Sequence, residues 1–490
     1  MSLLGTSPPR LRRAGRASRA SRASRAGRAS RASRASRAGR AGRALTALAT
    51  LLLLCASLSF APVGEGERKP NIVLIVADDL GYADLGVQGA RDVRTPHLDR
   101  LAAEGVRFTA GYATAPLCAP SRAALLTGRY GQRFGLETNP GSERDAAAGF
   151  GVPRDEPMLA ERLKAAGYAT AIVGKWHVGY EAELRPQRRG FDSFFGFLSG
   201  SSRYVARNLR NPILRGDEPT QVEGYLTDAF TREAVEFIGA HAEQPFFLYV
   251  PFNAVHVPLE APEPERERFA GIADEKRRTF AAMLAKLDSG VGAILAALDE
   301  KKLAEDTLVI FLSDNGGATA ENTSRNEPLR GEKPELYEGG VRVPFLVRWT
   351  GKLKPGAVEA RPVSSLDVVP TVLAAAGLAK SGARPDGKTD DKPLDGVDLV
   401  PFLTGKSKAR PHDALFWRIG KDSAARMGDW KLVVHGEQVE LYDLSEDLAE
   451  KTNLAKRRPE VVAKLRAAYA AWERQLVAPR WVPTRGAGDE

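Results

Sequence analysis

Cysteine is almost absent from this chain of 490 residues, which contains only Cys55 and Cys118. Cys55 lies in an apolar segment that we expect to be removed or buried in a membrane. The remaining chain then has a single thiol, which excludes an internal disulfide. A lone cysteine of this kind usually acts as a small buried hydrophobe. Histidine is also scarce, with six residues, so a histidine inside a longer motif is informative.

Long apolar runs are confined to the N-terminal region. Residues 44–56 are apolar and Leu-rich, and this length is typical of a signal-peptide core rather than of a stable transmembrane span. We expect export, either to the periplasm or out of the cell, and membrane anchoring by residues 44–63 if they are not cleaved. We expect no other stretch to be long and apolar enough to cross a bilayer.

Positive charge is unevenly distributed along the chain. Residues 1–43 hold 13 arginines and no acidic residue, and subtracting these from the net charge of +10 leaves −3 for residues 44–490. No aromatic residues alternate with these arginines and the rest of the chain is not basic, so we do not expect nucleic acid as a partner. The tail predicts a long signal n-region or a start site assigned too far upstream.

The remaining residues, about 420 of them, predict one large and one smaller domain. Short continuous apolar runs are typical of buried strands in a mostly parallel sheet; they occur at residues 71–77, 169–173, 246–250 and 307–312. Helices are predicted from about Glu275 to Asp299 and over residues 365–376, and a Pro- and Gly-rich loop at 382–394.

The pattern changes from about His412 onward. Residues 426–433 and 439–443 predict a small antiparallel sheet, and an amphipathic helix is expected from about Pro459. We therefore expect three parts: a tail and signal peptide (1–64), a large domain (65–405) and a small C-terminal subdomain (406–490).

Polar residues follow two of the predicted strands directly. Asp78 and Asp79 follow residues 71–77, and Asp314 and Asn315 come after residues 307–312. Ligands of open α/β sheets gather beyond the carboxyl ends of strands. Taken alone, two acids after a strand are more often a helix cap or a turn. The side chains can converge only if the two strands are neighbours in the sheet.

One stretch combines the remaining thiol with the start of a helix. Pro120 suits a first helical turn, Ala and Leu at 123–126 favour helix, and Gly128 predicts its end. Cys118 would then lie at a helix N-terminus, where free N–H groups favour a sulfate-like anion. Arg122 lies one turn further along the same face.

Two further polar residues follow the run at 169–173. Lys175 and His177 alternate with Trp176, so in an extended segment both polar side chains point the same way. The alternative is a histidine satisfied by the core and a lysine at the surface.

Together these motifs resemble one enzyme family. Cys-Ala-Pro-Ser-Arg at 118–122, Gly-Lys-Trp-His-Val-Gly at 174–179, and the segments 78–86, 95–99 and 329–344 resemble the type I, formylglycine-dependent sulfatases of the alkaline phosphatase superfamily. Within that family the chain resembles arylsulfatases and N-acetylgalactosamine sulfatases, and the resemblance covers roughly residues 68–480. It implies a large mixed, mostly parallel sheet sandwiched by helices, with a small C-terminal antiparallel sheet and a helix.

The resemblance also assigns roles to individual residues. It implies that a formylglycine-generating or sulfatase-maturing enzyme oxidises Cys118 to formylglycine, whose hydrate attacks sulfur, and that one Ca²⁺ ion is bound. Oxygen donors suit Ca²⁺ or Mg²⁺ better than zinc. The implied metal ligands are Asp78, Asp79, Cys118, Asp314 and Asn315. The implied catalytic residues are Cys118, Arg122, Lys175, His177, His256 and Lys333.

The chain departs from the family pattern around one of these residues. Glu332 and Pro334-Glu335 depart from the small residues usual near Lys333, which weakens the assignment of that lysine or marks substrate preference. We expect a sulfated carbohydrate as substrate rather than a steroid or simple aryl ester. Two alternatives remain: a phosphonate or phosphate ester hydrolase of the same superfamily, and a non-catalytic binder of sulfated glycans if Cys118 is never modified.

Overall fold

The computed structural model describes residues 68–140, 149–205, 211–378 and 392–481. Contacts divide the chain into residues 1–66 and residues 67–490, and the described residues all belong to the second unit. The signal peptide and tail predicted for residues 1–64 therefore lie outside the described residues, as does most of the loop predicted at 382–394. The domain boundary at 405/406 stays a prediction.

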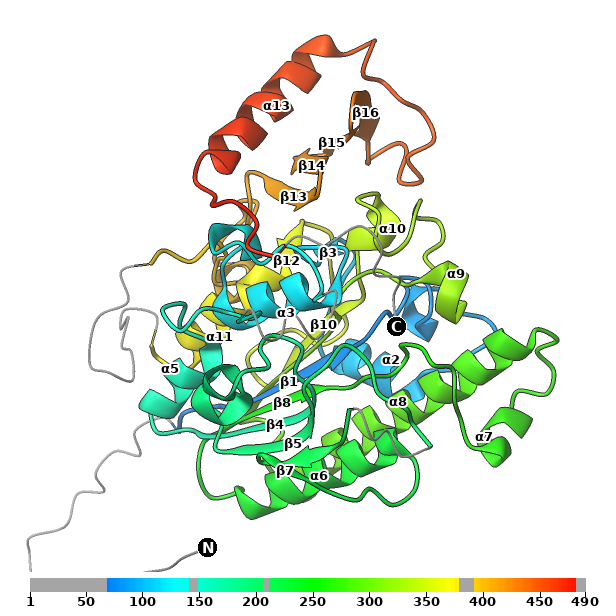
Figure 1. The fold of residues 1–490 in the computed structure, drawn as a ribbon, viewed down its shortest axis with the longest axis vertical. Coiled ribbons are helices and arrows are strands. Elements are labelled where there is room, and N and C mark those ends of the chain that lie inside the picture. Colours follow the sequence, from blue (N-terminus) through cyan, green and yellow to red (C-terminus); the bar gives the residue numbers. More distant parts are fainter. Residues whose placement is uncertain (1–67, 141–148, 206–210, 379–391, 482–490) are drawn as a thin grey trace, which may run out of the picture. The chain divides into compact units, whose positions relative to one another are not determined.

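The second unit is built around a ten-stranded sheet (Figure 1). Its central strands, from β9 to β5, are parallel neighbours, whereas antiparallel pairs occur toward both edges. This confirms the predicted large, mixed and mostly parallel sheet. In order across the sheet the strands are β11 (Ala357–Glu359), β2 (Val106–Phe108), β10 (Phe345–Trp349), β9 (Thr307–Ser313), β1 (Asn71–Ala77), β8 (Phe246–Pro251), β4 (Ala169–Lys175), β5 (Ser193–Phe197), β6 (Leu214–Arg215) and β7 (Glu218–Pro219). A separate pair joins β12 (Val363–Ser364) to β3 (Gly111–Tyr112).

The apolar runs form strands because both faces of the sheet are covered. Every residue of β1 is buried, and its side chains alternate between two hydrophobic cores. Ile72 and Leu74 belong to one core, whereas Val73 and Ile75 belong to the other. An amphipathic strand would leave one of these faces polar, so the continuous apolar pattern follows directly from a two-sided core.

Helices cover the sheet on both faces (Figure 1). The first core contains side chains of α3 (Cys118–Thr127), α5 (Leu159–Ala165) and α11 (Val368–Ala375). The second contains side chains of α2 (Pro96–Glu104), α6 (Leu226–Ala240) and α8 (Glu275–Glu300). Shorter helices are α7 (Glu263–Glu267), α9 (Thr319–Asn322), α10 (Glu338–Val341) and α12 (Val400–Leu403), and single 3₁₀ turns span Gly86–Gln88, Gly131–Arg133, Ala182–Leu184, Pro186–Arg188 and Ser365–Asp367.

The long helix α8 lies where the sequence predicts a helix, but it is mostly buried. Asp274 caps its start, because the Asp274 carboxylate accepts a hydrogen bond from the Arg277 N–H at 2.6 Å. Among the described residues α8 is long and apolar enough to cross a membrane, so the expectation that no such stretch exists beyond the N-terminal region is wrong on composition. Of its apolar window, 78% is buried inside the protein, as in the core helix of a globular domain.

The C-terminal part is a four-stranded antiparallel sheet with one helix, as predicted. The strands are β13 (Leu415–Ile419), β14 (Asp422–Met427), β15 (Trp430–His435) and β16 (Gln438–Asp443), and the helix is α13 (Pro459–Glu473). The predicted strand region 426–433 contains a tight turn, where Gly428 has a φ of +61°. Leu465 of α13 packs on one face of this sheet, and Trp417 and Val433 of the other face pack against Tyr112 and Tyr337.

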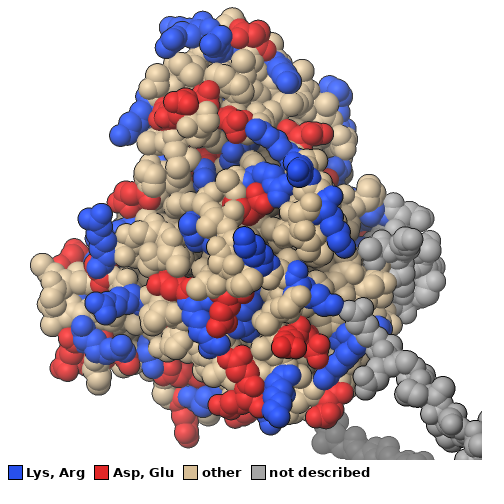
Figure 2. Space-filling view, turned by 180° about the vertical axis from the view of Figure 1, so that it is seen from behind, with Lys and Arg blue, Asp and Glu red and all other residues tan. Residues whose placement is uncertain are grey.

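On the face shown in Figure 2, Lys and Arg side chains are interspersed with Asp and Glu rather than gathered by sign. Exposed ion pairs such as Arg100–Glu104, at 2.6 Å, contribute about 0–1 kcal/mol each. Burying one Leu or Phe side chain contributes about 1.5–3 kcal/mol. The two cores on either face of the sheet therefore dominate the stability of the fold.

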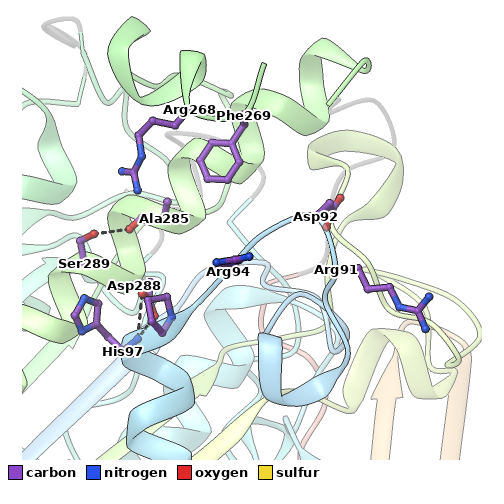
Figure 3. Close-up of a pocket in the computed structure, with 10 residues that line it drawn as sticks. Arg91, Asp92, Arg94, His97, Arg268, Phe269, Ala285, Asp288 and Ser289 are labelled. Carbon is purple, nitrogen blue, oxygen red and sulfur yellow. Dashed lines mark hydrogen bonds between the residues drawn. The ribbon is translucent and has the colours of Figure 1, made fainter. Parts of the chain in front are cut away.

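A cavity of about 450 Å³ lies beside α8 and the start of α2 (Figure 3). At its wall, the Asp288 carboxylate accepts hydrogen bonds from the N–H groups of His97, at 3.1 Å, and Leu98, at 2.8 Å. A residue of α8 thus caps α2 from a distance in sequence. None of the residues predicted for catalysis lines this cavity.

Candidate active site

The polar residues that follow β1 and β9 meet because these strands are parallel neighbours. Ala77 pairs with Ser313 at the carboxyl ends of the two strands. The Asp79 N–H donates a hydrogen bond to Asp314 Oδ1 at 3.3 Å, and Asn315 Nδ2 donates one to Asp79 Oδ1 at 2.6 Å. The structure thus brings the oxygen ligands expected for a cation into one buried group.

Cys118 is the first residue of α3 and points at these carboxylates. Its Sγ lies 3.5 Å from Asp78 Oδ1 and 4.0 Å from Asp79 Oδ1, and the residue is 1% exposed. The helix ends as predicted at Gly128, which adopts the left-handed conformation with a φ of +71°. Burial raises the pKa of the Cys118 thiol, although Lys175 opposes the shift, so the unmodified residue is a neutral thiol and a poor nucleophile.

Arg122 organises the carboxylates beside Cys118. Its Nε and Nη2 each lie 2.8 Å from Asp314 Oδ2, and Nη2 lies 3.5 Å from Asp78 Oδ2. Nη1 also donates a hydrogen bond to the Lys175 carbonyl at 3.3 Å. Arg122 is fully buried, so its charge is compensated entirely by these acids.

Lys175 and His177 reach the site from the end of β4, but the segment between them is not extended. Lys175 Nζ lies 2.7 Å from Asp78 Oδ2. His177 has a φ of +62°, in the left-handed region, which corrects the expected extended backbone. At this turn Trp176 packs into the first core, the His177 N–H donates to the Leu198 carbonyl at 3.0 Å, and a Cβ on Gly200 would lie 3.0 Å from the His177 imidazole.

His177 is poised as a neutral base. Its ring is buried, and its Nδ1 makes no hydrogen bond within the described part of the chain. Burial, together with the positive charges of Lys175 and Arg122, lowers the pKa of His177 well below its usual value. A neutral imidazole in this position can accept a proton.

His256 and Lys333 close the site from the opposite side. Lys333 Nζ lies 3.1 Å from Asp79 Oδ2, 3.7 Å from Cys118 Sγ and 3.5 Å from His256 Nε2. His256 Nδ1 lies 2.6 Å from the Val257 carbonyl oxygen, which orients Nε2 toward Lys333 and Asp79. Burial disfavours the charged form of Lys333, but the negative charge of Asp79 outweighs burial and holds the pKa of Lys333 well above its usual value.

The unusual glutamates around Lys333 have a structural role. The Glu332 carboxylate accepts hydrogen bonds from the Thr319 hydroxyl and from the Ala320 N–H, the latter at 2.8 Å, at the start of α9. Glu335 Oε2 accepts one from the Glu332 N–H at 3.1 Å. Both carboxylates therefore stabilise the loop, and neither prevents Lys333 from entering the site.

The residues present fit a hard divalent cation. One ligand atom from each of Asp78, Asp79, Cys118 and Asp314 lies within 4.8 Å of all the others. Asn315 Oδ1 is buried and accepts no hydrogen bond from a described residue, which is expected of an amide oxygen that serves as a metal ligand. Carboxylate and amide oxygens are preferred ligands of Ca²⁺.

The carboxylates of this group titrate differently. Burial opposes ionisation of Asp78, but Lys175 and other nearby cations outweigh it and lower its pKa. Burial, reinforced by the charge of Asp78, raises the pKa of Asp314 to about 6, although Arg122 opposes the shift. A bound divalent cation would favour the ionised forms of Asp78, Asp79 and Asp314.

Sequence reasoning missed residues that hold this arrangement together. Asn322 Nδ2 donates hydrogen bonds to the carbonyl oxygens of Asp79, at 3.1 Å, and Val255, at 3.2 Å. The Tyr204 hydroxyl donates to the carbonyl oxygen of His256 at 2.9 Å. These side chains lie far along the chain from the groups they support, and no local pattern marks them.

Known protein families match most of the chain, and the matches point to the same kind of enzyme. The sulfatase family model matches residues 70–378, and the model for the N-sulphoglucosamine sulphohydrolase C-terminal region matches residues 332–475. Steryl-sulfatase from Mus musculus is 36% identical over 441 residues, which cover 73% of this chain and 68% of that protein. N-acetylgalactosamine-6-sulfatase from Sus scrofa is 36% identical over 404 residues, covering 78% and 74%.

A solved structure agrees with these relatives. The crystal structure of Ps i-CgsB in complex with k-i-k-neocarrahexaose is similar with a TM-score of 0.79 and 34% identity, covering 85% of this chain and 96% of that chain. The family model, the curated relatives and the geometry at the ends of β1 and β9 thus lead to one conclusion: the chain belongs to the sulfatase family and is a sulfuric ester hydrolase.

Proposed function

We propose that this enzyme hydrolyses sulfate esters of a sulfated carbohydrate, using a formylglycine hydrate formed from Cys118. The observation that carries the proposal is the convergence of Lys333, His256 and the carboxylate group on one buried side chain at a helix N-terminus. The carbohydrate class is supported by the N-acetylgalactosamine-6-sulfatase relatives and by the oligosaccharide bound to Ps i-CgsB.

Oxidation of Cys118 by a sulfatase-maturing enzyme would replace a poorly reactive buried thiol with a better nucleophile. The neutral thiol is a weak nucleophile. A hydrated aldehyde offers two hydroxyl groups on one carbon: one attacks sulfur, and the other allows the resulting sulfate ester to break down. A serine at this position would lack the second hydroxyl group.

The surrounding side chains would divide the remaining tasks. Lys175 and Lys333 are cations that can bind sulfate oxygens, and His256 is placed to protonate the leaving alcohol. His177 is placed to take a proton from the second hydroxyl of residue 118, which expels sulfate and restores the aldehyde. A Ca²⁺ ion held by Asp78, Asp79, Asp314, Asn315 and residue 118 would supply positive charge beside the sulfate group.

Mass spectrometry of the peptide that carries residue 118 tests this proposal. After co-expression with a sulfatase-maturing enzyme we expect formylglycine at position 118 and hydrolysis of a carbohydrate sulfate. Cys118→Ala should fold with unchanged circular dichroism and lose activity by several orders of magnitude, as other nucleophile removals do. Near-wild-type turnover by Cys118→Ala would refute the proposal.

Substrate comparison separates the remaining alternatives. A sulfate ester should react faster than a phosphonate or phosphate ester with the same leaving group, and the reverse order would indicate the phosphoryl-transfer branch of the superfamily. A protein that keeps an unmodified Cys118 and binds sulfated glycans without hydrolysis would be a binder.

We further propose that the protein is exported and that residues 44–56 act as the core of a signal peptide. The apolar composition of this segment supports the proposal. N-terminal sequencing of protein recovered from the periplasm or the medium should show cleavage after the apolar segment. Recovery of the full-length chain from the membrane fraction would instead indicate anchoring by residues 44–63.

A further inference from the structure

A cluster of buried charges joins the C-terminal sheet to the segment that carries Lys333. Lys431, on β15, places its Nζ 2.9 Å from Glu338 Oε1 and 3.1 Å from Glu450 Oε1, and the side chains of all three residues are fully buried. Glu338 begins α10, and Glu450 accepts a hydrogen bond from its backbone N–H at 2.7 Å. Because a buried charge without a partner is strongly unfavourable, these three side chains hold one another in place.

Glu338 is also held by residues outside the C-terminal sheet. Its Oε2 accepts a hydrogen bond from the Tyr112 hydroxyl at 2.6 Å and contacts Arg342 Nη1 at 3.0 Å. Burial opposes its ionisation, but Lys431 and Arg342 outweigh burial and lower the pKa of Glu338 to about 2. The ionised Glu338 carboxylate therefore links Lys431 of the C-terminal sheet to Tyr112 and Arg342 outside it.

The short helix α10 couples Glu338 to the neighbouring loops, because it packs against them without free space. The Gly339 N–H donates to the Arg330 carbonyl at 2.7 Å, and the Gly316 N–H donates to the Gly340 carbonyl at 2.9 Å. A Cβ on Gly339 would lie 2.0 Å from the Gly331 carbonyl oxygen. A shift of α10 therefore has to move the 330–333 loop and the turn that follows Asn315.

Lys333 depends on both of these segments. Its N–H donates to the Gly317 carbonyl at 3.3 Å, and its Nζ extends to within 3.7 Å of Cys118 Sγ. Its side chain is 13% exposed, so it has little freedom to compensate for a displaced backbone. A displacement of about 1 Å at a reacting group can cost roughly 10²-fold in rate.

We infer that Lys431, acting through Glu338 and α10, is a positioning residue for Lys333. This inference rests on the proposed function, which places Lys333 at the sulfate group. The C-terminal sheet then contributes to catalysis without touching the substrate.

The test is Lys431→Met, which keeps most of the length of the side chain and removes its charge. We expect kcat/KM for a nitrophenyl sulfate to fall roughly 10–100-fold, as for other supporting residues, and amide hydrogen exchange of residues 330–341 to become faster. Glu161→Gln is a control for the loss of a buried charge at another place: Glu161 is a buried carboxylate at the start of α5 and accepts a hydrogen bond from the Met158 N–H at 2.8 Å. It should lower the unfolding midpoint and leave kcat/KM and exchange at 330–341 unchanged.

Two combined variants separate positioning from stability. Adding Lys431→Met to Lys333→Ala should cost no further activity, because the group to be positioned is gone. Burial raises the pKa of Glu450 to about 7, although Lys431 opposes the shift. At alkaline pH, adding Glu450→Gln to Lys431→Met therefore removes an unpaired carboxylate, so it should restore the unfolding midpoint and leave kcat/KM low. An equal fold-loss with and without Lys333, or recovery of kcat/KM together with stability, would overturn the inference.

Hydrogen exchange keeps the inference testable apart from activity. Unchanged exchange at 330–341 in folded Lys431→Met would overturn it even if the enzyme is a sulfatase. Absence of sulfatase activity in the matured wild-type protein would instead refute the proposed function. If Lys431→Met does not fold, Glu450→Gln alone should show faster exchange in the same segment, and unchanged exchange there would overturn the inference.

Discussion

Replacing His256 by alanine should affect substrates according to their leaving groups. An activated ester such as a nitrophenyl sulfate leaves as a weak base and needs little protonation, whereas a sugar alkoxide needs it strongly. General acid catalysis contributes typically 10²–10⁴-fold. Since each tenfold corresponds to about 1.36 kcal/mol, His256→Ala should raise the barrier for a sugar sulfate by about 2.7–5.4 kcal/mol more than for the activated ester.

The geometry of the site makes His256 a better acid than Lys333. His256 Nδ1–H donates a hydrogen bond to the Val257 carbonyl oxygen at 2.6 Å, so Nε2 is the nitrogen that faces the site, 3.5 Å from Lys333 Nζ. Nε2 can give a proton to the substrate when both ring nitrogens are protonated. Lys333 is held in its charged form by Asp79, and a lysine with a raised pKa binds an anion better than it releases a proton. Removing His256 should therefore leave sulfate binding largely intact and mainly lower kcat for the poor leaving group.

The assay compares kcat/KM for the two substrates in the wild type and in His256→Ala. His241→Ala serves as the control, because His241 lies at the end of α6, bonded to the Phe237 carbonyl, and should change neither rate. Equal fold-losses on both leaving groups would refute the acid role of His256 and leave Lys333 as the candidate.

Three further predictions concern the metal, the second histidine and pH. Asp314→Ala should lose both activity and bound Ca²⁺, because it removes a carboxylate from the buried group; full calcium occupancy by metal analysis would show the site to be misassigned. His177→Ala should slow both classes of substrate similarly and accumulate a sulfated residue 118, visible as a mass increase of that peptide; absence of the adduct would contradict the assigned role. His412 Nε2 lies 2.8 Å from Asp367 Oδ1, and although burial opposes the shift, this carboxylate raises the pKa of His412 above 6.5. The resulting stabilisation is fully present below pH 6.5 and is lost as pH rises through the raised pKa. Urea unfolding midpoints of the wild type should therefore fall over that interval, and His412→Ala should remove this part of the pH dependence.

Much of the fold and of the site could be predicted because the decisive patterns are local. The continuous apolar run at 71–77 becomes β1 with the same bounds, since a strand buried on both faces needs no polar side. Helix α3 begins at Cys118 and ends before Gly128, which adopts a left-handed conformation that glycine populates without a steric cost. The same reasoning predicted that Asp78, Asp79 and Asp314 directly follow strands. It did not predict that the side chains after β1 and β9 contact each other.

Some predictions failed because backbone geometry depends on packing. The segment around Lys175 and His177 was expected to be extended, yet His177 has a φ of +62° and its N–H donates to the carbonyl oxygen of Leu198, a residue beyond the end of β5. Residues 426–433 contain a turn at Gly428 that alternation of side chains does not mark. Composition also allows α8 to cross a membrane, whereas its packing between α2 and α6 makes it a core helix.

By itself the sequence determined the central strands such as β1, helices such as α3 and α8, and the chemical types of the site residues, because these depend on side chains close together in the chain. Only the tertiary structure decided how they combine. It placed β1 beside β9, so that Asp79 and Asn315 meet at 2.6 Å although they lie 236 residues apart. It also buried Lys431 between Glu338 and Glu450, where the cost of an unpaired charge holds distant segments together. Such contacts arise from the order of strands in a sheet and from burial, and neither is written in any local pattern.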